Sequence, residues 1–237
     1  MAAAGYVTLT RQTGLMREMQ VIANNIANAA TTGFRQAGLT FSEYVARGGD
    51  GASLSMANAN VAQISTRQGT LAETGSALDM AIEGDGYFLI ATPEGERLTR
   101  AGNFTRNPQG ELVTAAGHRV LDEGGAPVFV PPDSGRPGLA ADGTLSADGR
   151  PLGRIAVVRP VDPAGLRHEA NVLFRAEGGV EPAVAARLKQ GFLESSNVDP
   201  VLQMARMIEV QRAYEMGQSF LQSENERMRN AIDTFTR

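Results

Sequence analysis

The chain has 237 residues, of which 42% are hydrophobic and 20% charged, so it is long enough to bury a core as one or two domains. The net charge of −4, with no basic stripe, excludes a nucleic-acid-binding footprint. The chain contains no cysteine, which excludes disulfides and thiolate metal sites, and no apolar run approaches the roughly 18 residues that a membrane span needs.

The first predicted element is a long amphipathic helix over residues 6–32. Its apolar stripe recurs at spacings of four and three residues: Leu15, Met19, Ile22, Ile26 and Ala29. Gly33 is expected to stop the helix, because glycine takes the left-handed conformation at little cost, and Phe34 is expected to fold back onto the last turn. Since the stripe is narrow, it favours pairing with another helix over burial in a globular core.

Three asparagines occupy the end of this predicted helix, although asparagine is a poor helix former. Asn24 and Asn28 share one helical face, and Asn25 lies beside them. Two interpretations are open. The asparagines form a solvated polar face, or their amides fix the register against a neighbouring helix.

The middle of the chain divides into two stretches with different sequence patterns. Residues 35–75 are loosely patterned and are predicted to form an extended connector. Over residues 76–190, strand-length apolar runs alternate with turn sequences such as Gly84-Asp-Gly86 and Asp148-Gly149. This alternation predicts a central antiparallel β domain.

A second long helix is predicted over about residues 196–235, within a C-terminal segment of residues 191–237, with Asn197 or Asp199 as its cap. Apolar residues recur along it every seven positions: Met207, Tyr214, Leu221, Met228 and Phe235. A row that is polar at its centre stands three positions before each of these: Met204, Gln211, Gln218, Asn225 and Ile232. Such a heptad sacrifices stability to specify register and partner. Gly217 within it is expected to allow a close backbone approach.

The predicted fold class is therefore α+β. Helices from residues 1–34 and 191–237 are expected to pair as a coiled-coil-like terminal domain, with the all-β domain between them. One partner helix is not expected to satisfy all the polar seam positions, which predicts contacts with other subunits.

Three blocks of sequence resemble the bacterial flagellar rod and hook proteins. The first is Ala23-Asn-Asn-Ile-Ala-Asn-Ala-Ala-Thr-Thr-Gly-Phe34. The second contains Thr74-Gly-Ser-Ala-Leu-Asp-Met-Ala-Ile-Glu-Gly-Asp-Gly-Tyr-Phe-Leu-Ile90 and Thr99-Arg-Ala-Gly-Asn-Phe104. The third contains Gln190-Gly-Phe-Leu-Glu-Ser-Ser-Asn-Val198 and Gln211-Arg-Ala-Tyr-Glu215. The resemblance covers nearly the whole chain and is greatest to the proximal rod members, with the distal rod members as the alternative.

The resemblance implies a structural protein that assembles with copies of itself and with other proximal and distal rod subunits into a helical tube. This tube crosses the periplasm, transmits torque and encloses the export channel. The resemblance also implies export by the flagellar type III apparatus without a cleaved signal, and no insertion into the membrane. The terminal helices would form the inner layer, with these subunit-interface residues: Leu15, Met19, Ile22, Asn24, Asn25, Ile26, Asn28, Met207, Gln211, Tyr214, Gln218, Leu221, Asn225, Met228 and Phe235.

The alternative of a different class is an exported β-rich hydrolase or carbohydrate-binding module with helical ends. It would need a constellation of chemical groups, and the candidates are weak. His118 and His168 are predicted to be surface histidines, and Glu83 and Asp85 are predicted to build a hairpin turn. The sequence predicts no catalytic residue, cofactor site or metal site. Because the locally costly residues lie on the helical seams, the structural subunit is favoured.

Overall fold

The structure is a computed structural model that describes residues 2–47, 53–169 and 172–235. The chain divides into two compact units. Unit 1 takes in Met1–Ala27, Ala37–Gln63 and Asp199–Arg237, and unit 2 takes in Asn28–Gln36 and Ile64–Val198. Among the described helices, neither combines the length and the apolar character that crossing a membrane requires.

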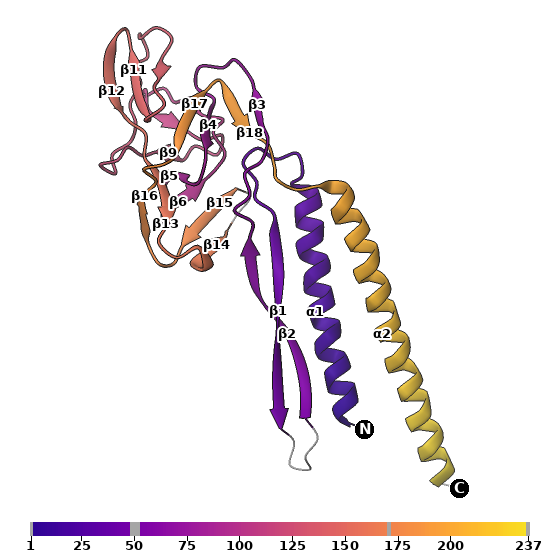
Figure 1. The fold of residues 1–237 in the computed structure, drawn as a ribbon. Helices are drawn as coiled ribbons and strands as arrows, with labels where there is room; N and C mark the ends of the chain where they lie inside the picture. Colours follow the sequence, from indigo (N-terminus) through magenta and orange to yellow (C-terminus); the bar gives the residue numbers. More distant parts are fainter. Residues whose placement is uncertain (1, 48–52, 170–171, 236–237) are drawn as a thin grey trace. The chain divides into compact units, whose positions relative to one another are not determined.

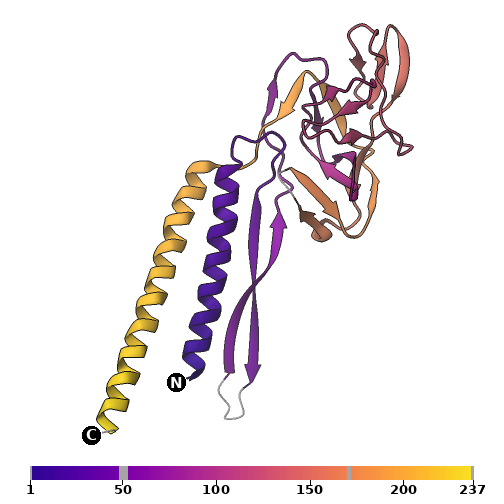
Figure 2. The ribbon, with the colours of Figure 1, turned by 180° about the vertical axis from the view of Figure 1, so that it is seen from behind.

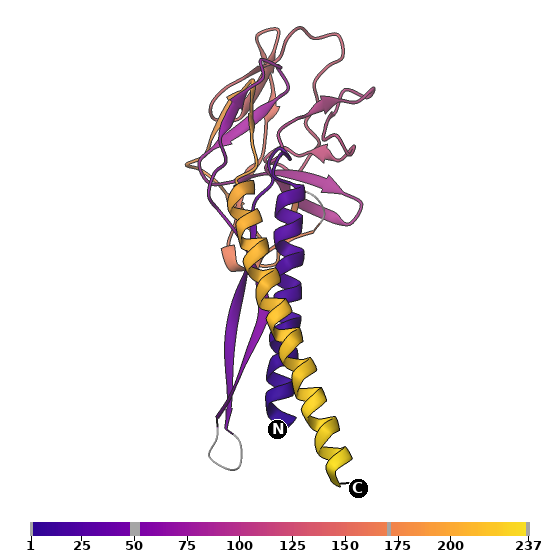
Figure 3. The same cartoon turned by 90° about the vertical axis from the view of Figure 1, so that its right-hand side faces the viewer.

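Unit 1 is built from two long helices and two strands. Its elements are α1 (Ala2–Ala27), β1 (Ala37–Arg47), β2 (Ser53–Ile64) and α2 (Pro200–Phe235). α1 contacts both α2 and β1, and it lies between α2 and the β1–β2 pair (Figures 1 and 2). Figure 3 shows α2 inclined to α1. The predicted pairing of the two terminal helices in an α+β chain is confirmed.

The first helix ends earlier than predicted. α1 stops at Ala27, and turns follow it, in which the Asn28 carbonyl accepts a hydrogen bond from the Thr31 N–H (3.1 Å). This is the behaviour that makes asparagine a poor helix former. Gly33 does have the expected left-handed backbone (φ 71°), but it ends these turns and not the helix. Phe34 is buried in unit 2, where its ring lies against that of His168.

Within residues 35–75, which were predicted as an extended connector, the structure places the strands β1 and β2, which pair with each other. α2 begins at Pro200, later than the predicted residue 196. The Asp199 carboxylate accepts hydrogen bonds from the Val201 and Leu202 N–H groups (3.0 and 3.1 Å), so Asp199 is the cap.

Unit 2 is an antiparallel β structure, as the central sequence pattern predicts. Its largest sheet has the order β14-β15-β6-β5-β9-β8-β7, and β13 joins this sheet at β5 and pairs on its other side with β16. Smaller sheets are β10-β11-β12, β17-β4 and β18-β3. The bounds are β3 (Leu71–Glu73), β4 (Met80–Glu83), β5 (Tyr87–Thr92), β6 (Gly95–Thr99), β7 (Thr105–Arg106), β8 (Leu112–Val113), β9 (Arg119–Val120), β10 (Gly138–Leu139), β11 (Thr144–Ala147), β12 (Arg150–Arg154), β13 (Val157–Pro160), η1 (Pro163–Gly165), β14 (Leu166–His168), β15 (Leu173–Ala176), β16 (Val180–Pro182), β17 (Arg187–Gln190) and β18 (Phe192–Glu194).

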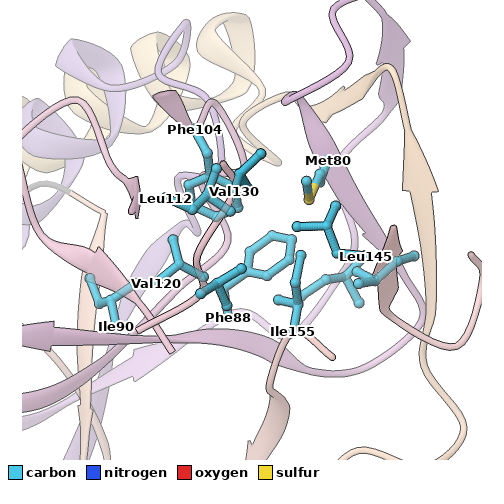
Figure 4. Packing of buried hydrophobic residues seen from close by; sticks show 12 residues of the cluster. Met80, Phe88, Ile90, Phe104, Leu112, Val120, Val130, Leu145 and Ile155 are labelled. Atoms are coloured by element: carbon cyan, nitrogen blue, oxygen red, sulfur yellow. The ribbon is translucent and has the colours of Figure 1, made fainter. Parts of the chain in front are cut away.

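Two apolar clusters form the core of unit 2. Figure 4 shows the first, in which side chains from several strands and loops pack together: Met80, Phe88, Ile90, Phe104, Leu112, Val120, Val130, Leu145 and Ile155. The second gathers around Tyr87, Leu98, Leu166 and Phe174. Burying this many large apolar side chains gives unit 2 a core of its own, since each contributes about 1.5–3 kcal/mol when fully buried.

Candidate functional site

We define the seam of unit 1 as the residues of α1 and α2 that are at least half-buried. The seam has heptad spacing. On α2 these are Gln203, Met207, Val210, Ala213, Tyr214, Gly217, Leu221 and Glu224. On α1 the predicted stripe is covered: Ile22 is buried, and Leu15, Met19 and Ile26 are half-buried. The predicted row on α2 is half-buried at Met207, Tyr214 and Leu221, whereas Met228 is exposed and the side chain of Phe235 lies outside the described residues.

The second row of α2 lies one residue earlier than predicted. The seam uses Gln203, Val210, Gly217 and Glu224, while the predicted row is exposed: Met204, Gln211, Gln218, Asn225 and Ile232. A seven-residue repeat allows a neighbouring row on either flank of its apolar row, so the repeat alone does not decide between them. Gln211 and Gln218 donate within α2, to the Glu215 carboxylate (3.0 Å) and the Tyr214 hydroxyl (3.1 Å).

Asn25 ties three elements of unit 1 together. Its amide nitrogen donates to the Ala37 carbonyl (2.8 Å) and to the Gln203 side-chain oxygen (3.2 Å), and its oxygen accepts from the Ala37 N–H (3.0 Å). Asn25 is only 1% exposed. Its amide therefore bonds to a neighbouring helix, as one of the two interpretations expects, but within the same chain. Asn24 is exposed, and Asn28 lies beyond the end of α1.

A second side-chain amide, that of Gln12, makes another close contact in the seam. The buried Gln12 side chain donates to the Tyr214 carbonyl (2.9 Å). A Cβ atom at Gly217 would lie 2.2 Å from the Gln12 side-chain nitrogen, so glycine is what lets the two helices approach at this point. The close contact at Gly217 is thus made by a side chain of α1 and not by its backbone.

We expect Gly217→Ala to destabilise the helix pair by about 1–3 kcal/mol through overpacking, despite the roughly 1 kcal/mol that alanine gains over glycine in a helix. The double variant Gln12→Ala/Gly217→Ala removes the clashing amide and is expected to recover most of this loss. Urea unfolding of the full chain measures both. Greater stability of Gly217→Ala than of the natural chain would show that Gln12 is not pinned against α2.

Unit 2 contains a buried ionic cluster, which we define as Arg35, Arg100 and Glu194. One oxygen of Glu194 lies 2.9 Å from Arg35 Nη2 and accepts from the Gly69 N–H (2.9 Å), and the other lies 2.9 Å from Arg100 Nε. The three side chains are at most 2% exposed. Burial lowers the pKa of Arg100 to about 10, so its guanidinium is charged at neutral pH. The Glu194 carboxylate is thus the counter-charge of two buried guanidinium groups.

Backbone carbonyls and amides extend this cluster. Arg35 also donates to the carbonyls of Thr66 (2.7 Å) and Arg67. The Asn197 side chain accepts from the Gln36 N–H (2.7 Å) and donates to the Arg67 carbonyl (2.7 Å). Three stretches that are far apart in sequence, each next to a point where the chain passes between units, are therefore held together inside unit 2.

Two glycines make room for these contacts. A Cβ atom at Gly69 would lie 1.9 Å from the Ser195 carbonyl oxygen, and one at Gly33 would lie 2.3 Å from the Ala101 backbone nitrogen. Both obstacles are backbone atoms, which cannot move aside as a flexible side chain can. Glycine at positions 33 and 69 thus has a packing reason in this chain.

Comparison with known proteins places these segments in one family. Residues 6–35 match the family described as "Flagella basal body rod protein", residues 81–147 match "Flagellar hook protein FlgE/F/G D1 domain", and residues 189–234 match "Flagellar basal body rod FlgEFG protein C-terminal". The flagellar basal-body rod protein FlgF of Caulobacter vibrioides is 40% identical over 96% of each chain. The chain belongs to the flagellar basal-body rod FlgE/F/G family.

Other relatives agree. FlgF of Mesorhizobium japonicum is 42% identical over 89% of this chain and 88% of its own. The rod protein FlgG of Bacillus subtilis is 32% identical over 96% of this chain and 97% of its own. As a member of the FlgE/F/G family, the chain is a structural subunit of the flagellar basal-body rod and not an enzyme, and membership implies assembly with rod subunits.

His168 and Glu83, two of the weak candidates for catalysis, make packing and ion-pair contacts in the structure. His168 lies on strand β14, half-buried between aromatic rings, and is not the surface histidine predicted. Glu83 ends β4 and pairs with Lys189 at 2.7 Å. Within the described residues, no group of three His, Asp or Glu side chains is placed to hold a metal ion.

The ionic cluster and the seam amides Gln12 and Gln203 were not predicted from sequence. A signal for the cluster was present, because Arg100 and Glu194 stand inside two of the blocks that carry the resemblance, and Arg35 directly follows the remaining block. A charged residue within an otherwise apolar and glycine-rich block is unusual, since buried charges occur almost only when paired.

Proposed function

We propose that this chain serves as an FlgF-type subunit of the rod, joining copies of itself and other rod proteins in a helical tube that transmits torque and encloses an export channel. Its relationship to the FlgF relatives, at 40% and 42% identity against 32% for the FlgG of Bacillus subtilis, supports the FlgF type. On this proposal it reaches the periplasmic space through the flagellar type III export apparatus without a cleaved signal.

The observation that carries the proposal is the apolar surface that the paired helices leave uncovered. Ten large apolar side chains on α1 and α2 are at least 44% exposed: Leu9, Met16, Val201, Leu202, Met204, Ile208, Met216, Phe220, Met228 and Ile232. This many exposed apolar side chains on the two helices of unit 1 mark an interaction site. In a heterologous helical assembly, each such helix meets different faces of several neighbours, and growth stays open along the axis.

The predicted interface residues divide into two groups on this view. The exposed ones are available to neighbouring subunits: Asn24, Gln211, Gln218, Asn225 and Met228. Others are engaged between α1 and the rest of unit 1, Asn25 most completely. We propose that the exposed group sets the axial register between subunits, and that Asn25 acts indirectly by fixing the shape of unit 1.

Replacing Phe220 with aspartate tests the proposal, because Phe220 is an exposed apolar residue of α2. We expect the variant to fold as a monomer but not to restore motility or complete rods in a strain that lacks the gene. Val184→Asp places the same charge at an exposed apolar position of unit 2 and is the matched control, which is expected to restore motility. Normal rods with Phe220→Asp would contradict the proposed surface.

A further inference from the structure

His168 lies in an aromatic cluster of unit 2. Its ring centroid is 5.3 Å from that of Phe34 and 5.0 Å from that of Phe174, and Phe174 lies 5.4 Å from Tyr87. Phe34 and Phe174 are almost completely buried. The Nε2 atom of His168 is also buried, and it has no hydrogen-bond partner within the part of the chain that the structure describes. An imidazolium has to donate from both nitrogens, whereas a neutral ring can leave this one unprotonated.

No charge near the ring compensates for a proton. Most charged side chains on residues 28–36 and on and beside β6, β14 and β15 are already paired with one another: Arg35 with Glu194, Arg97 with Glu169, Arg167 with Glu177, Arg175 with Glu169 and Glu177, and Arg100 with Glu194. Glu96 of β6 is exposed to solvent. No ion pair of the described residues includes His168. A cation formed here would therefore be desolvated without a counter-charge.

We propose that His168 is an acid-sensitive latch on the turn of residues 28–36. The neutral imidazole packs against Phe34 and keeps this turn on unit 2. Proton uptake forces the ring toward solvent and removes the surface on which Phe34 rests. Because Arg35 of the ionic cluster lies on the same turn, loosening the turn also weakens the hold of Arg35 on Glu194.

The direction of the pH effect follows from burial. Burial lowers the pKa of His168 below its usual value of 6.5. Well above pH 6.5 the ring is neutral in both the closed and the opened turn, and the latch has its full strength. As pH falls below 6.5 the opened state binds the proton first, so the closed turn loses stability until the folded protein is protonated too.

Amide hydrogen exchange of the full chain at a series of pH values tests the latch, with rates corrected for the intrinsic pH dependence of exchange. Between about pH 7.5 and pH 5, protection in residues 28–36 and in β14 is expected to fall at least about threefold, while β4 and β17 stay protected. Side-chain NMR of the same sample gives the pKa of His168 directly. A measured pKa at or above 6.5 would overturn the proposal.

The variant His168→Phe gives a more specific test than the pH series alone, since phenylalanine keeps an aromatic ring against Phe34 but does not titrate. Protection of residues 28–36 in this variant is expected to be independent of pH. His118→Phe changes the other histidine of the chain and is the matched control, which should behave like the natural protein. An equal acid-induced loss in His168→Phe would show that another group is responsible. If His168→Phe does not fold, the pKa of His168 in the natural chain decides alone.

Discussion

Replacing Glu194 with glutamine is expected to destabilise unit 2 by about 3–5 kcal/mol, the cost of breaking a buried ion pair by removing one partner. The amide has nearly the shape of the carboxylate, so the loss comes from charge and not from packing. Arg35 and Arg100 would then be two buried guanidiniums without a counter-charge. The expected result is early loss of hydrogen-exchange protection throughout the strands of unit 2.

Glu181→Gln is the matched control for this prediction. Glu181 pairs with Arg159 at 2.6 Å, but both side chains are exposed by more than two fifths. An exposed pair contributes about 0–1 kcal/mol, so this variant is expected to unfold close to the natural chain. Equal small effects of the two substitutions would contradict the importance given to the ionic cluster.

Replacing Asn25 with leucine is expected to destabilise unit 1 by about 2–4 kcal/mol while leaving the strands of unit 2 protected. The substitution leaves the Ala37 N–H, the Ala37 carbonyl and the Gln203 amide without the partner that Asn25 provides, and each unsatisfied buried group costs about 1–3 kcal/mol. Circular dichroism of the helices during urea unfolding measures the loss. We also expect this variant not to assemble into rods.

Gln211→Leu separates folding from assembly. Gln211 is exposed on α2 and its side chain bonds only within that helix, to Glu215, among the contacts found. This variant is expected to unfold as the natural chain does, so loss of motility would place Gln211 at a contact between subunits. Normal motility with Gln211→Leu would count against the proposal that the exposed polar row sets register.

Much of the fold was accessible from sequence because local patterns carry it. The seven-residue row through Tyr214 predicted a helix with one covered face, and the turn sequences around Gly86 predicted the antiparallel β structure. Asn25 was recognised as unusual because asparagine is costly in a helix. The patterns did not settle on which side of the apolar row of α2 the second seam row lies, since a row on either side has the same seven-residue period.

The ionic cluster depends on long-range contacts that periodicity does not show. Arg35 follows the first helix, Arg100 follows β6 and Glu194 ends β18, and only the folded sheet brings them together. The same holds for His168, whose flanking sequence suggests a surface turn although β15 and Phe34 cover its ring. The early end of α1 was missed because the apolar stripe continues to Ala29, while the backbone already bonds to Asn28 in turns.

The most direct test of the rod-subunit account uses the absence of cysteine from the chain. Met216→Cys introduces one thiol on the exposed apolar face of α2, and its reaction with a maleimide can be compared between the purified monomer and isolated hook–basal bodies. The account predicts rapid labelling of the monomer, protection in the intact basal bodies, and recovered labelling when those basal bodies are dissolved in denaturant. Equal labelling of the monomer and the intact assembly would contradict burial of this helix face between rod subunits.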